Sequence, residues 1–421
     1  MKWKAPRGTR DLLPDETARW HEAETRARRL LDTYGYEEIV TPIFEDTGLF
    51  VHGTGETTDI VAREMYTFED RKGRSMTLRP EGTPGVVRAC LEHNIAGAAE
   101  SADVARLFYI GPFFRYERPQ KGRYRQFWQI GAEAIGSGSP LLDAEMATLA
   151  VRLCESIGLS DTRLLLNSIG CDNCRPAYRE LLVGYLRSAA GKLCDDCVAR
   201  IETNPLRALD CKKPGCKSAL KDAPLPSEHL CGECEDHFAA VCAAIDAAAI
   251  PYERDPHLVR GLDYYTRTAF EVVHEGLGAR AAAAGGGRYD GLVETLGGKP
   301  TPAVGFAAGF DALMILAEQA GADLTHPRAA DVYVAPLSDK ALGPAYATAS
   351  ALREAGIRAR AGLSARSLKA QLRFADKAAA THVVIIGPSE MAAGTLLLRD
   401  MRSGEQAQAA PEGLVDLLLP G

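Results

Sequence analysis

Residues 113–133 read FFRYERPQKGRYRQFWQIGAE, and this segment contains the most informative pattern in the chain. Apolar and aromatic residues at its two ends predict a pair of strands, and the turn between them carries five basic residues opposed only by Glu117. Such a turn suits a nucleoside triphosphate, because guanidinium groups pair with phosphate oxygens and an aromatic ring can stack on a base. It also suits single-stranded RNA. A merely solvated charged hairpin would leave the interleaved aromatic residues unexplained.

This hairpin belongs to a larger set of predicted strands, at residues 36–42, 76–79, 107–115, 127–135 and 268–273. Gly and Pro break the pattern between strands, and few helices intervene. This arrangement favours an antiparallel sheet with helices packed on it. Apolar periodicity predicts helices over residues 15–34 and 141–157. The expected fold class is therefore α+β.

Length and composition limit the class of protein. The chain has 421 residues, of which 46% are hydrophobic and 25% charged, a globular composition with room for two or three domains. Its net charge of −7 excludes a uniformly basic nucleic-acid coat but allows a local basic face. The chain has no run of about 18 apolar residues and no apolar N-terminal segment. We therefore expect a cytoplasmic protein with no membrane partner.

The pattern changes after a linker at residues 320–330. Short apolar strands then alternate with helices, at residues 331–335, 343–355, 357–361, 363–379, 381–386 and 396–399. The alternation predicts a separate α/β domain over residues 329–421 with a largely parallel sheet. Seven basic and only two acidic residues lie between positions 353 and 377. They indicate either a solvated helix face or a surface that contacts a phosphate backbone.

Three shorter segments carry further candidate chemistry. In LVRGLDYYTRTAFE, residues 258–271, an arginine could neutralise a carboxylate or phosphate, and two tyrosine hydroxyls could line a polar pocket, although tyrosine pairs commonly line cores. The glycines of AAAAGGGRYDGL, residues 281–292, allow close backbone approach to a bound group or form a tight strand-to-turn connection, but they lack the P-loop pattern. In SMTLRPEG, residues 75–82, Glu81 could receive a substrate amine or lie in an exposed loop.

Eight of the eleven cysteines lie in residues 167–254, a segment that has the character of an insertion. They form four close pairs: Cys171 with Cys174, Cys194 with Cys197, Cys211 with Cys216, and Cys231 with Cys234. In a reducing compartment this spacing favours tetrahedral Zn²⁺, as one or two ions in a structural role. The alternative is a set of reduced, buried thiols.

Taken together, these segments closely resemble the histidyl-tRNA synthetases, a family of class II aminoacyl-tRNA synthetases, over essentially the whole chain. RGTRDLLP, residues 7–14, resembles the family's opening signature. Residues 15–42 resemble class II motif 1, and FRYERPQKGRYRQF, residues 114–127, resembles motif 2. LVRGLDYYTRTAFE and GGGRYDGL resemble the two histidine-specific signatures. The order and spacing of all these motifs agree with the family.

The resemblance implies a class II catalytic domain over residues 1–325, interrupted by the cysteine-rich insertion, and a C-terminal α/β anticodon-binding domain. It implies a histidine–tRNA ligase that uses ATP with Mg²⁺. Histidine and ATP would give histidyl-adenylate and pyrophosphate, and the histidyl group would then pass to the 3′ end of tRNA(His). Motif 1 implies a homodimer.

For the site, the resemblance implies positioned positive charge beside a polar pocket. Arg115 and Arg260 would be the catalytic residues, because they would hold the α-phosphate and stabilise the charge that develops there. ATP would also contact Glu117 and Arg123, and Phe127 would stack on adenine. Histidine would be bound by Glu81, Thr83, Arg115, Gln129, Glu133, Arg260, Tyr264 and Tyr265. A pocket that satisfies both imidazole nitrogens rejects apolar analogues, because they leave buried groups unpaired.

Two positions depart from the family pattern. In VGFAAGFDALMIL, residues 304–316, Ala312 stands where motif 3 has an arginine that packs on adenine and contacts the terminal phosphate. Loss of such a charged contact costs about 1.5–3 kcal/mol, or roughly 10- to 200-fold in binding. Trp128 stands where the family usually has histidine, and strand alternation predicts that its side chain points away from Gln129.

These departures leave a second hypothesis open. Some relatives of this family do not charge tRNA and instead bind histidine or RNA, for example as regulatory subunits of ATP phosphoribosyltransferase. This chain keeps both the Arg260 signature and the C-terminal module, which favours the synthetase. A free-standing RNA-binding protein would not account for Glu81, Gln129 and Glu133.

Overall fold

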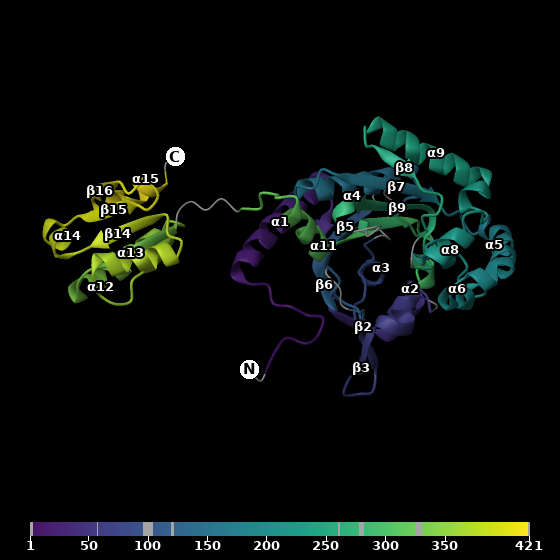
Figure 1. Ribbon diagram of the computed structural model, residues 1–421, viewed down its shortest axis with the longest axis horizontal. Coiled ribbons are helices and arrows are strands. Elements are labelled where there is room, and N and C mark those ends of the chain that lie inside the picture. Colours follow the sequence, from purple (N-terminus) through teal and green to yellow (C-terminus); the bar gives the residue numbers. More distant parts are fainter. Residues whose placement is uncertain are drawn as a thin grey trace. The chain divides into compact units, whose positions relative to one another are not determined.

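The computed structural model describes residues 3–56, 58–95, 104–118, 122–259, 262–277, 282–325 and 331–419. The chain divides into two compact units, residues 1–325 and residues 326–421 (Figure 1). Each unit has hydrophobic clusters of its own. None of the described helices is long and apolar enough to cross a membrane.

The first unit is built on an eight-stranded sheet with the strand order β1-β5-β6-β11-β10-β9-β7-β8. In that order the strands are β1 (Glu37–Glu38), β5 (Ala105–Phe114), β6 (Gln126–Ile135), β11 (Ala303–Gly309), β10 (Ala282–Arg288), β9 (Thr266–His274), β7 (Thr162–Ser168) and β8 (Tyr252–Arg254). The six central strands pair antiparallel, and only the two short edge strands pair parallel. The predicted α+β fold with an antiparallel sheet is confirmed.

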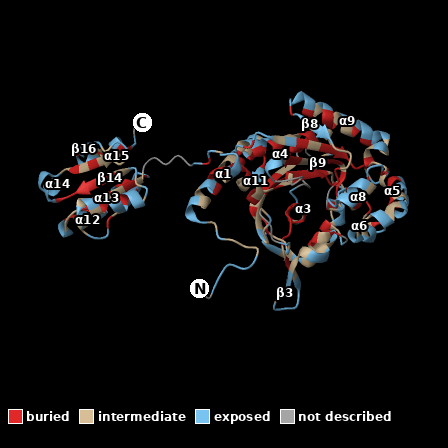
Figure 2. Ribbon diagram, viewed as in Figure 1, coloured by how far each residue is buried: buried red, intermediate tan, exposed pale blue. Residues whose placement is uncertain are grey.

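Helices cover one face of this sheet through a continuous apolar cluster. They are α1 (Pro14–Thr33), α4 (Pro140–Ser156), α9 (Gly232–Ala247) and α11 (Phe310–Gln319). Leu149 and Leu153 of α4 are fully buried in the same cluster as Ile130 of β6. Figure 2 shows that the strands of the sheet are largely buried, whereas the outer sides of the surrounding helices are exposed.

The opposite face of the sheet carries a second apolar cluster and most of the polar residues that the sequence predicts for the site. It is covered by α3 (Thr83–Glu92), by α10 (Leu292–Thr295) and by the helices of the cysteine-rich insertion. Nearby lie α2 (Thr47–Thr54), a π-helical turn (Ile60–Glu64) and a small sheet of β2 (Phe44–Asp46), β4 (Ser75–Leu78) and β3 (Tyr66–Glu69). Apolar packing therefore occurs on both faces of the main sheet, whereas the candidate chemistry lies on the second face only.

The cysteine-rich insertion leaves the sheet after β7 and returns to it at β8. Its helices are α5 (Arg175–Ala189), α6 (Asp195–Arg200), α7 (Leu206–Leu209) and α8 (Pro214–Ala219), followed by α9 (Figure 1). Leu182, Leu186 and Tyr178 of α5 are buried and anchor this small helical layer.

The second unit holds a five-stranded sheet with the order β13-β12-β14-β15-β16. Its strands are β12 (Asp331–Pro336), β13 (Arg358–Ala361), β14 (His382–Ile386), β15 (Leu396–Asp400) and β16 (Gln406–Ala409). Its helices are α12 (Leu342–Glu354), α13 (Leu368–Lys377), α14 (Pro388–Ala393) and α15 (Leu414–Leu418). Short 3₁₀ turns complete the two units, at Ala190–Lys192, Pro226–Glu228, Glu275–Leu277, Asp339–Ala341 and Pro411–Gly413.

Three predictions about elements are corrected by the structure. The second sheet is mixed, because β12 pairs parallel with β13 and β14, but β14–β15 and β15–β16 pair antiparallel. The helix expected over residues 363–379 begins only at Leu368, after the fully exposed Leu363. The strand expected over residues 36–42 is reduced to Glu37–Glu38, because only these two residues pair with β5.

Candidate active site

The side chain of Glu81 lies in a polar pocket on the second face of the sheet. It follows β4, precedes α3 and is only 5% exposed. Its Oε1 accepts a hydrogen bond from the Thr54 hydroxyl at 2.5 Å, and its Oε2 accepts one from the Tyr264 hydroxyl at 2.9 Å. Two neutral hydroxyl groups therefore fix the orientation of this carboxyl group.

Glu133 of β6 is the second buried carboxyl group of the pocket, with 1% of its surface exposed. Its Oε1 accepts a hydrogen bond from the Thr83 hydroxyl at 2.7 Å, and its Oε2 accepts one from the Tyr289 hydroxyl. The Tyr289 ring meets the Tyr264 ring edge-on, with 5.6 Å between centroids. Tyrosine packing thus joins the two carboxyl groups into one cluster.

The surroundings of this cluster shift both carboxyl groups toward their neutral forms. The pKa of Glu133 is raised to about 8, mainly by burial and in part by the nearby charge of Glu81, while the hydrogen bonds from Tyr289 and Thr83 oppose the change. Burial also raises the pKa of Glu81, although the positive charge of Arg115 opposes that change. Paired carboxyl groups with perturbed pKa values in a buried site are typical of ligand binding or catalysis.

Two polar groups in this region have no hydrogen-bond partner within the described part of the chain, namely Gln129 Oε1 and the Tyr109 hydroxyl. Gln129 lies four residues before Glu133 on β6, so their side chains share a face. Tyr109 of β5 pairs with Gly131, and its ring occupies the space that a side chain at Gly131 would need. Because an unpartnered buried polar atom is costly, both atoms indicate the place of a polar ligand.

The glycine-rich segment lies within strand β10 rather than in a turn. A Cβ atom at Gly286 would overlap the carbonyl oxygen of Gly305, and a Cβ atom at Gly305 would overlap Glu133 Oε2. Neither position can hold a larger residue without a shift of its neighbours. The glycines therefore let two strands and a carboxyl group pack against one another.

The predicted ATP residues lie together at the base of the β5–β6 hairpin. The Arg115 guanidinium lies 5.4 Å from the centre of the Phe127 ring, and its Nε donates to the Pro80 carbonyl at 2.8 Å. The Glu117 carboxylate lies 4.0 Å from Arg115 and 3.7 Å from Arg123. A flat aromatic ring beside two cationic groups offers complementary surfaces for a base and for phosphates.

The start of α11 contains the departure from motif 3. Ala312 is partly exposed, whereas Asp311 beside it is buried and accepts hydrogen bonds from the Trp128 backbone N–H at 2.7 Å and from Arg10 at 3.0 Å. Arg10 also pairs with Glu16. The Trp128 ring packs edge-on against Trp20 on the other face of the sheet, as strand alternation predicts.

The structure therefore brings most of the predicted site residues together. Glu81, Thr83, Glu133 and Tyr264 are joined by hydrogen bonds, and the Tyr265 ring lies 4.8 Å from that of Tyr264. Gln129 faces the same side, and Arg115 connects this pocket to Glu117, Arg123 and Phe127. Arg260, the second predicted catalytic residue, lies outside the described residues.

Sequence reasoning missed Thr54, Tyr109 and Tyr289 as parts of the pocket. Tyr289 belongs to the segment whose glycines attract attention, so a tyrosine beside them was an available signal. The adjacent Arg288 is fully buried and pairs with Asp143 of α4, its Nε lying 2.9 Å from Asp143 Oδ1. Arg288 therefore fastens α4 to β10.

The eight clustered cysteines form two groups of four. One contains Cys171, Cys174, Cys231 and Cys234, and the other contains Cys194, Cys197, Cys211 and Cys216. Within each group all Sγ atoms lie within 4.8 Å of one another. Each group therefore offers the ligand type and number of a tetrahedral metal site.

An antiparallel sheet whose face holds a buried carboxyl pair beside an arginine–aromatic hairpin is the catalytic arrangement of class II aminoacyl-tRNA synthetases. Comparison with known proteins narrows this class. Residues 8–313 match the family model described as histidyl-tRNA synthetase, and residues 331–419 match the model described as anticodon binding domain. The chain belongs to the histidyl-tRNA synthetase family.

Individual relatives agree with this assignment. A protein of Halothermothrix orenii named histidine–tRNA ligase is 48% identical over 416 residues, which cover 99% of each chain. One of Desulfatibacillum aliphaticivorans with the same name is 48% identical, covering 98% of this chain and 97% of its own. The crystal structure of apo S. aureus histidyl-tRNA synthetase is 35% identical, covers 99% of each chain and superposes with a TM-score of 0.82.

Proposed function

We infer that this chain is a histidine–tRNA ligase. It activates histidine with ATP to form histidyl-adenylate and pyrophosphate, and then transfers the histidyl group to the 3′ end of tRNA(His). The observation that carries this conclusion is the buried Glu81–Glu133 cluster beside Arg115 and Phe127, in a chain nearly half identical to histidine–tRNA ligases over its full length.

The polar cluster binds the amino acid. The α-ammonium group and the imidazole ring of histidine donate hydrogen bonds, which the side-chain oxygens of Glu81, Glu133 and Gln129 accept. The buried Tyr265 and the partly exposed Tyr264 form the walls around the ring. An apolar amino acid of similar size would leave these buried groups unpaired, which is the physical basis of selectivity.

The hairpin residues bind ATP and stabilise the transition state. Adenine stacks on Phe127, and Arg115 holds the α-phosphate at the point where the histidine carboxylate attacks it. The bond from the α-phosphorus to pyrophosphate breaks as the new phosphorus–oxygen bond forms, and Arg115 stabilises the added negative charge. Arg260, in the first histidine-specific signature, also binds the α-phosphate and stabilises this charge. Arg123 and Glu117 contact the nucleotide from the loop.

ATP is used with Mg²⁺, which prefers oxygen ligands and neutralises phosphate charge. Glu117 and Glu64 supply two carboxyl groups in this region, because the backbone N–H of Tyr116, next to Glu117, donates a hydrogen bond to the Glu64 carbonyl at 2.7 Å. These oxygen donors fit such an ion. The two cysteine groups fit a different metal, Zn²⁺, and their place in the insertion assigns it a structural role.

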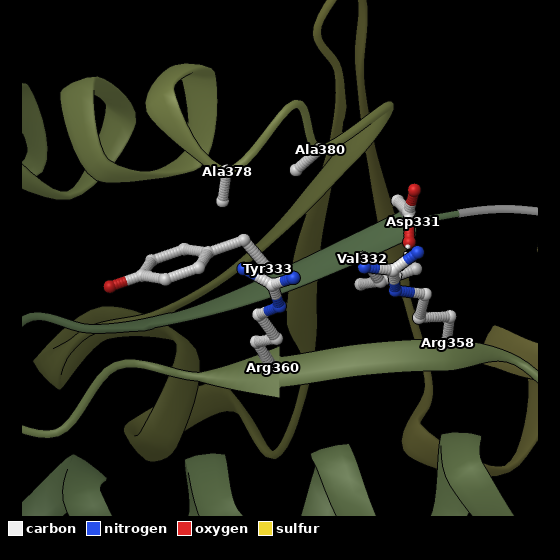
Figure 3. Close-up of a pocket in the computed structure, with 7 residues that line it drawn as sticks. All are labelled: Asp331, Val332, Tyr333, Arg358, Arg360, Ala378 and Ala380. Carbon is white, nitrogen blue, oxygen red and sulfur yellow. Dashed lines mark ion pairs between the residues drawn. The ribbon is translucent and has the colours of Figure 1, made fainter. Parts of the chain in front are cut away.

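The second unit binds the anticodon arm of tRNA(His). A shallow pocket lies beside β13, where Arg358 and Arg360 project from one side of the strand (Figure 3). Arg358 pairs with Asp331 at 3.0 Å, and the Tyr333 ring lies in the same pocket. Cationic side chains beside an aromatic ring suit phosphates and an unstacked base.

The active protein is a homodimer. An apolar surface formed by Val40, Ile43, Phe44 and Phe68 is exposed on a single chain. It lies in and next to the motif 1 segment, and the Phe44 and Phe68 rings lie 6.1 Å apart. Exposed apolar residues that cluster in this way are typical of a protein–protein interface.

One observation favours a second candidate, a family member that binds histidine without charging tRNA. Ala312 removes the motif 3 cation from the ATP site, and Arg10 is already paired with Asp311 and Glu16. A histidine-binding paralogue would keep the carboxyl cluster and lose exchange activity.

The deciding experiment is histidine-dependent ATP–pyrophosphate exchange, followed by charging of tRNA(His). We expect exchange with histidine and not with other amino acids. Arg115→Ala should reduce the exchange rate by about 100-fold or more, because it removes a charge that stabilises the transition state. Arg118→Ala, an exposed cation of the same loop, is the matched control and should leave the rate nearly unchanged. Absence of exchange, with histidine still bound, would establish the non-charging paralogue.

A further inference from the structure

The two cysteine groups are nested along the chain, one inside the other. Cys171 and Cys174 follow β7, and their partners Cys231 and Cys234 lie 60 residues later at the start of α9. The second group, Cys194, Cys197, Cys211 and Cys216, lies entirely between these two pairs. One group therefore closes the base of the insertion, and the other lies within it.

The distances between sulfur atoms fit metal thiolates and not disulfides. Cys171 Sγ lies 3.7 Å from Cys174 Sγ and 3.8 Å from Cys231 Sγ, and Cys174 Sγ lies 3.8 Å from Cys234 Sγ. In the second group, Cys194 Sγ lies 4.0 Å from Cys211 Sγ. A tetrahedral Zn²⁺ ion with bonds of about 2.3 Å to sulfur separates its ligands by about 3.8 Å. A disulfide bond would need about 2.05 Å.

Backbone groups around both sites are arranged to stabilise thiolate sulfur. The Cys171 N–H donates to Cys174 Sγ at 3.1 Å, and the Cys194 N–H donates to Cys216 Sγ at 3.2 Å. In each group two of the four cysteines are buried and two are partly exposed. Four buried or half-buried thiols held this close without a cation would repel one another as soon as they ionised. Both groups therefore have the surroundings of built metal sites.

We propose that the insertion binds two Zn²⁺ ions, one in each four-cysteine group, and that the ion at the base of the insertion positions the histidine pocket. The base group is Cys171, Cys174, Cys231 and Cys234, and the inner group is Cys194, Cys197, Cys211 and Cys216. The second half of this proposal rests on the proposed histidine–tRNA ligase function, whereas the metal content does not.

The contacts that connect the base group to the pocket are short. Arg175, directly after Cys174, donates a hydrogen bond to the backbone carbonyl of Tyr265. Gly170, directly before Cys171, accepts a hydrogen bond from the Arg267 N–H at 2.8 Å, and the Ile169 N–H donates to the Arg267 carbonyl at 2.7 Å. The base group is thus held on both sides to the segment that carries Tyr264 and Tyr265. The connection from the inner group is more remote: Asn204, which lies between Cys197 and Cys211 but next to neither, donates a hydrogen bond to the Asp263 carboxylate at 2.5 Å.

The first test is the metal content of the full-length protein. Purified wild-type protein should contain two zinc ions per chain, and the metal-free protein should take up two Co²⁺ ions with the absorption of tetrahedral cobalt thiolate. The double variants Cys171→Ser/Cys174→Ser and Cys194→Ser/Cys197→Ser should each retain one ion. Cys242→Ala, a buried cysteine outside both groups, should retain two. A wild-type content of one or none, or cobalt spectra without thiolate bands, would overturn the two-site proposal.

The second test is the KM for histidine in pyrophosphate exchange. The base-group variant should raise the KM for histidine, leave the KM for ATP unchanged and reduce kcat less than it raises KM. The inner-group variant should leave the KM for histidine near the wild-type value. Equal KM values in both variants would overturn the positioning role while the zinc count stands. Failure of the wild-type protein to exchange would overturn the proposed function without changing the metal content.

Discussion

The carboxyl group of Glu133 holds a proton under conditions in which most carboxyl groups have lost theirs. Its pKa is about 8 in the folded protein, compared with an ordinary value of 4.5. Between these values the folded protein binds a proton that the unfolded chain has released. Stability must therefore fall as the pH rises from about 4.5 to 8 because of this group.

Replacement of Glu133 by glutamine tests this linkage. The glutamine side chain stays neutral and able to hydrogen-bond at every pH, so the urea midpoint of Glu133→Gln should fall less between pH 5.5 and pH 8.5 than that of the wild-type protein. Fluorescence suits the measurement, because Trp3, Trp20 and Trp128 all lie in the first unit. Glu37→Gln, at an exposed position of β1, should follow the wild type. Parallel pH profiles for Glu133→Gln and wild type would contradict the raised pKa.

Ala312 is the position at which a single substitution should improve the enzyme. The position is partly exposed at the start of α11, and an arginine there would restore the motif 3 cation. Ala312→Arg should gain about 1.5–3 kcal/mol of ATP binding, which lowers the KM for ATP roughly 10- to 200-fold. Exchange at varied ATP concentration measures this, and Ala312→Gln is the uncharged control. An unchanged KM for ATP in Ala312→Arg would mean that another group already supplies the contact.

Strands β6, β10 and β11 pack unusually closely beside the pocket. Gly286 of β10 leaves room for the Gly305 carbonyl, and Gly305 of β11 leaves room for the Glu133 carboxyl group of β6. Gly305→Ala would place a methyl group on the Glu133 carboxyl group. We expect a loss of about 1–3 kcal/mol of stability from overpacking, together with a higher KM for histidine.

The matched control for this prediction is Gly184→Ala in the interior of α5. A Cβ atom there meets nothing within 4 Å, and the position is exposed. Because glycine disfavours helix, this change should stabilise the protein by about 0.5–1 kcal/mol. Urea unfolding followed by fluorescence measures both variants. If Gly305→Ala binds histidine with wild-type KM and stability, the close packing has no role in the pocket.

Local patterns determine how well the elements could be predicted. The arms of the β5–β6 hairpin agree with prediction within two residues, because runs of apolar and aromatic residues are visible in the sequence. The length of β1 and the start of α13 were predicted wrongly, because pairing partners and tertiary contacts set both. In the site, motifs identified Glu81 and Glu133. Tyr109 could not be identified, because only the β5–β6 register places it opposite Gly131.

The two units have separate hydrophobic cores and different proposed functions. The residues proposed to bind histidine and ATP belong to the first unit, and Arg358 and Arg360 of β13 belong to the second. The second unit packs its own apolar clusters, in which Val334 and Val384 are fully buried. In the proposed function, the first unit therefore carries out activation, and the second, which matches the anticodon binding domain model, recognises tRNA.

The proposed homodimer would bury apolar residues that are exposed on a single chain. Val40 is 82% exposed and lies next to Ile43 and Phe44, so an aspartate at position 40 would introduce a charge into the proposed interface. Val40→Asp should convert a dimer to a monomer in sedimentation velocity at micromolar concentration. Leu363→Asp in the second unit, at a position that is 97% exposed and outside the proposed interface, should leave the mass unchanged. A wild-type protein that sediments as a monomer, or a Val40→Asp variant that remains a dimer, would show that the apolar surface at residues 40–44 has another role.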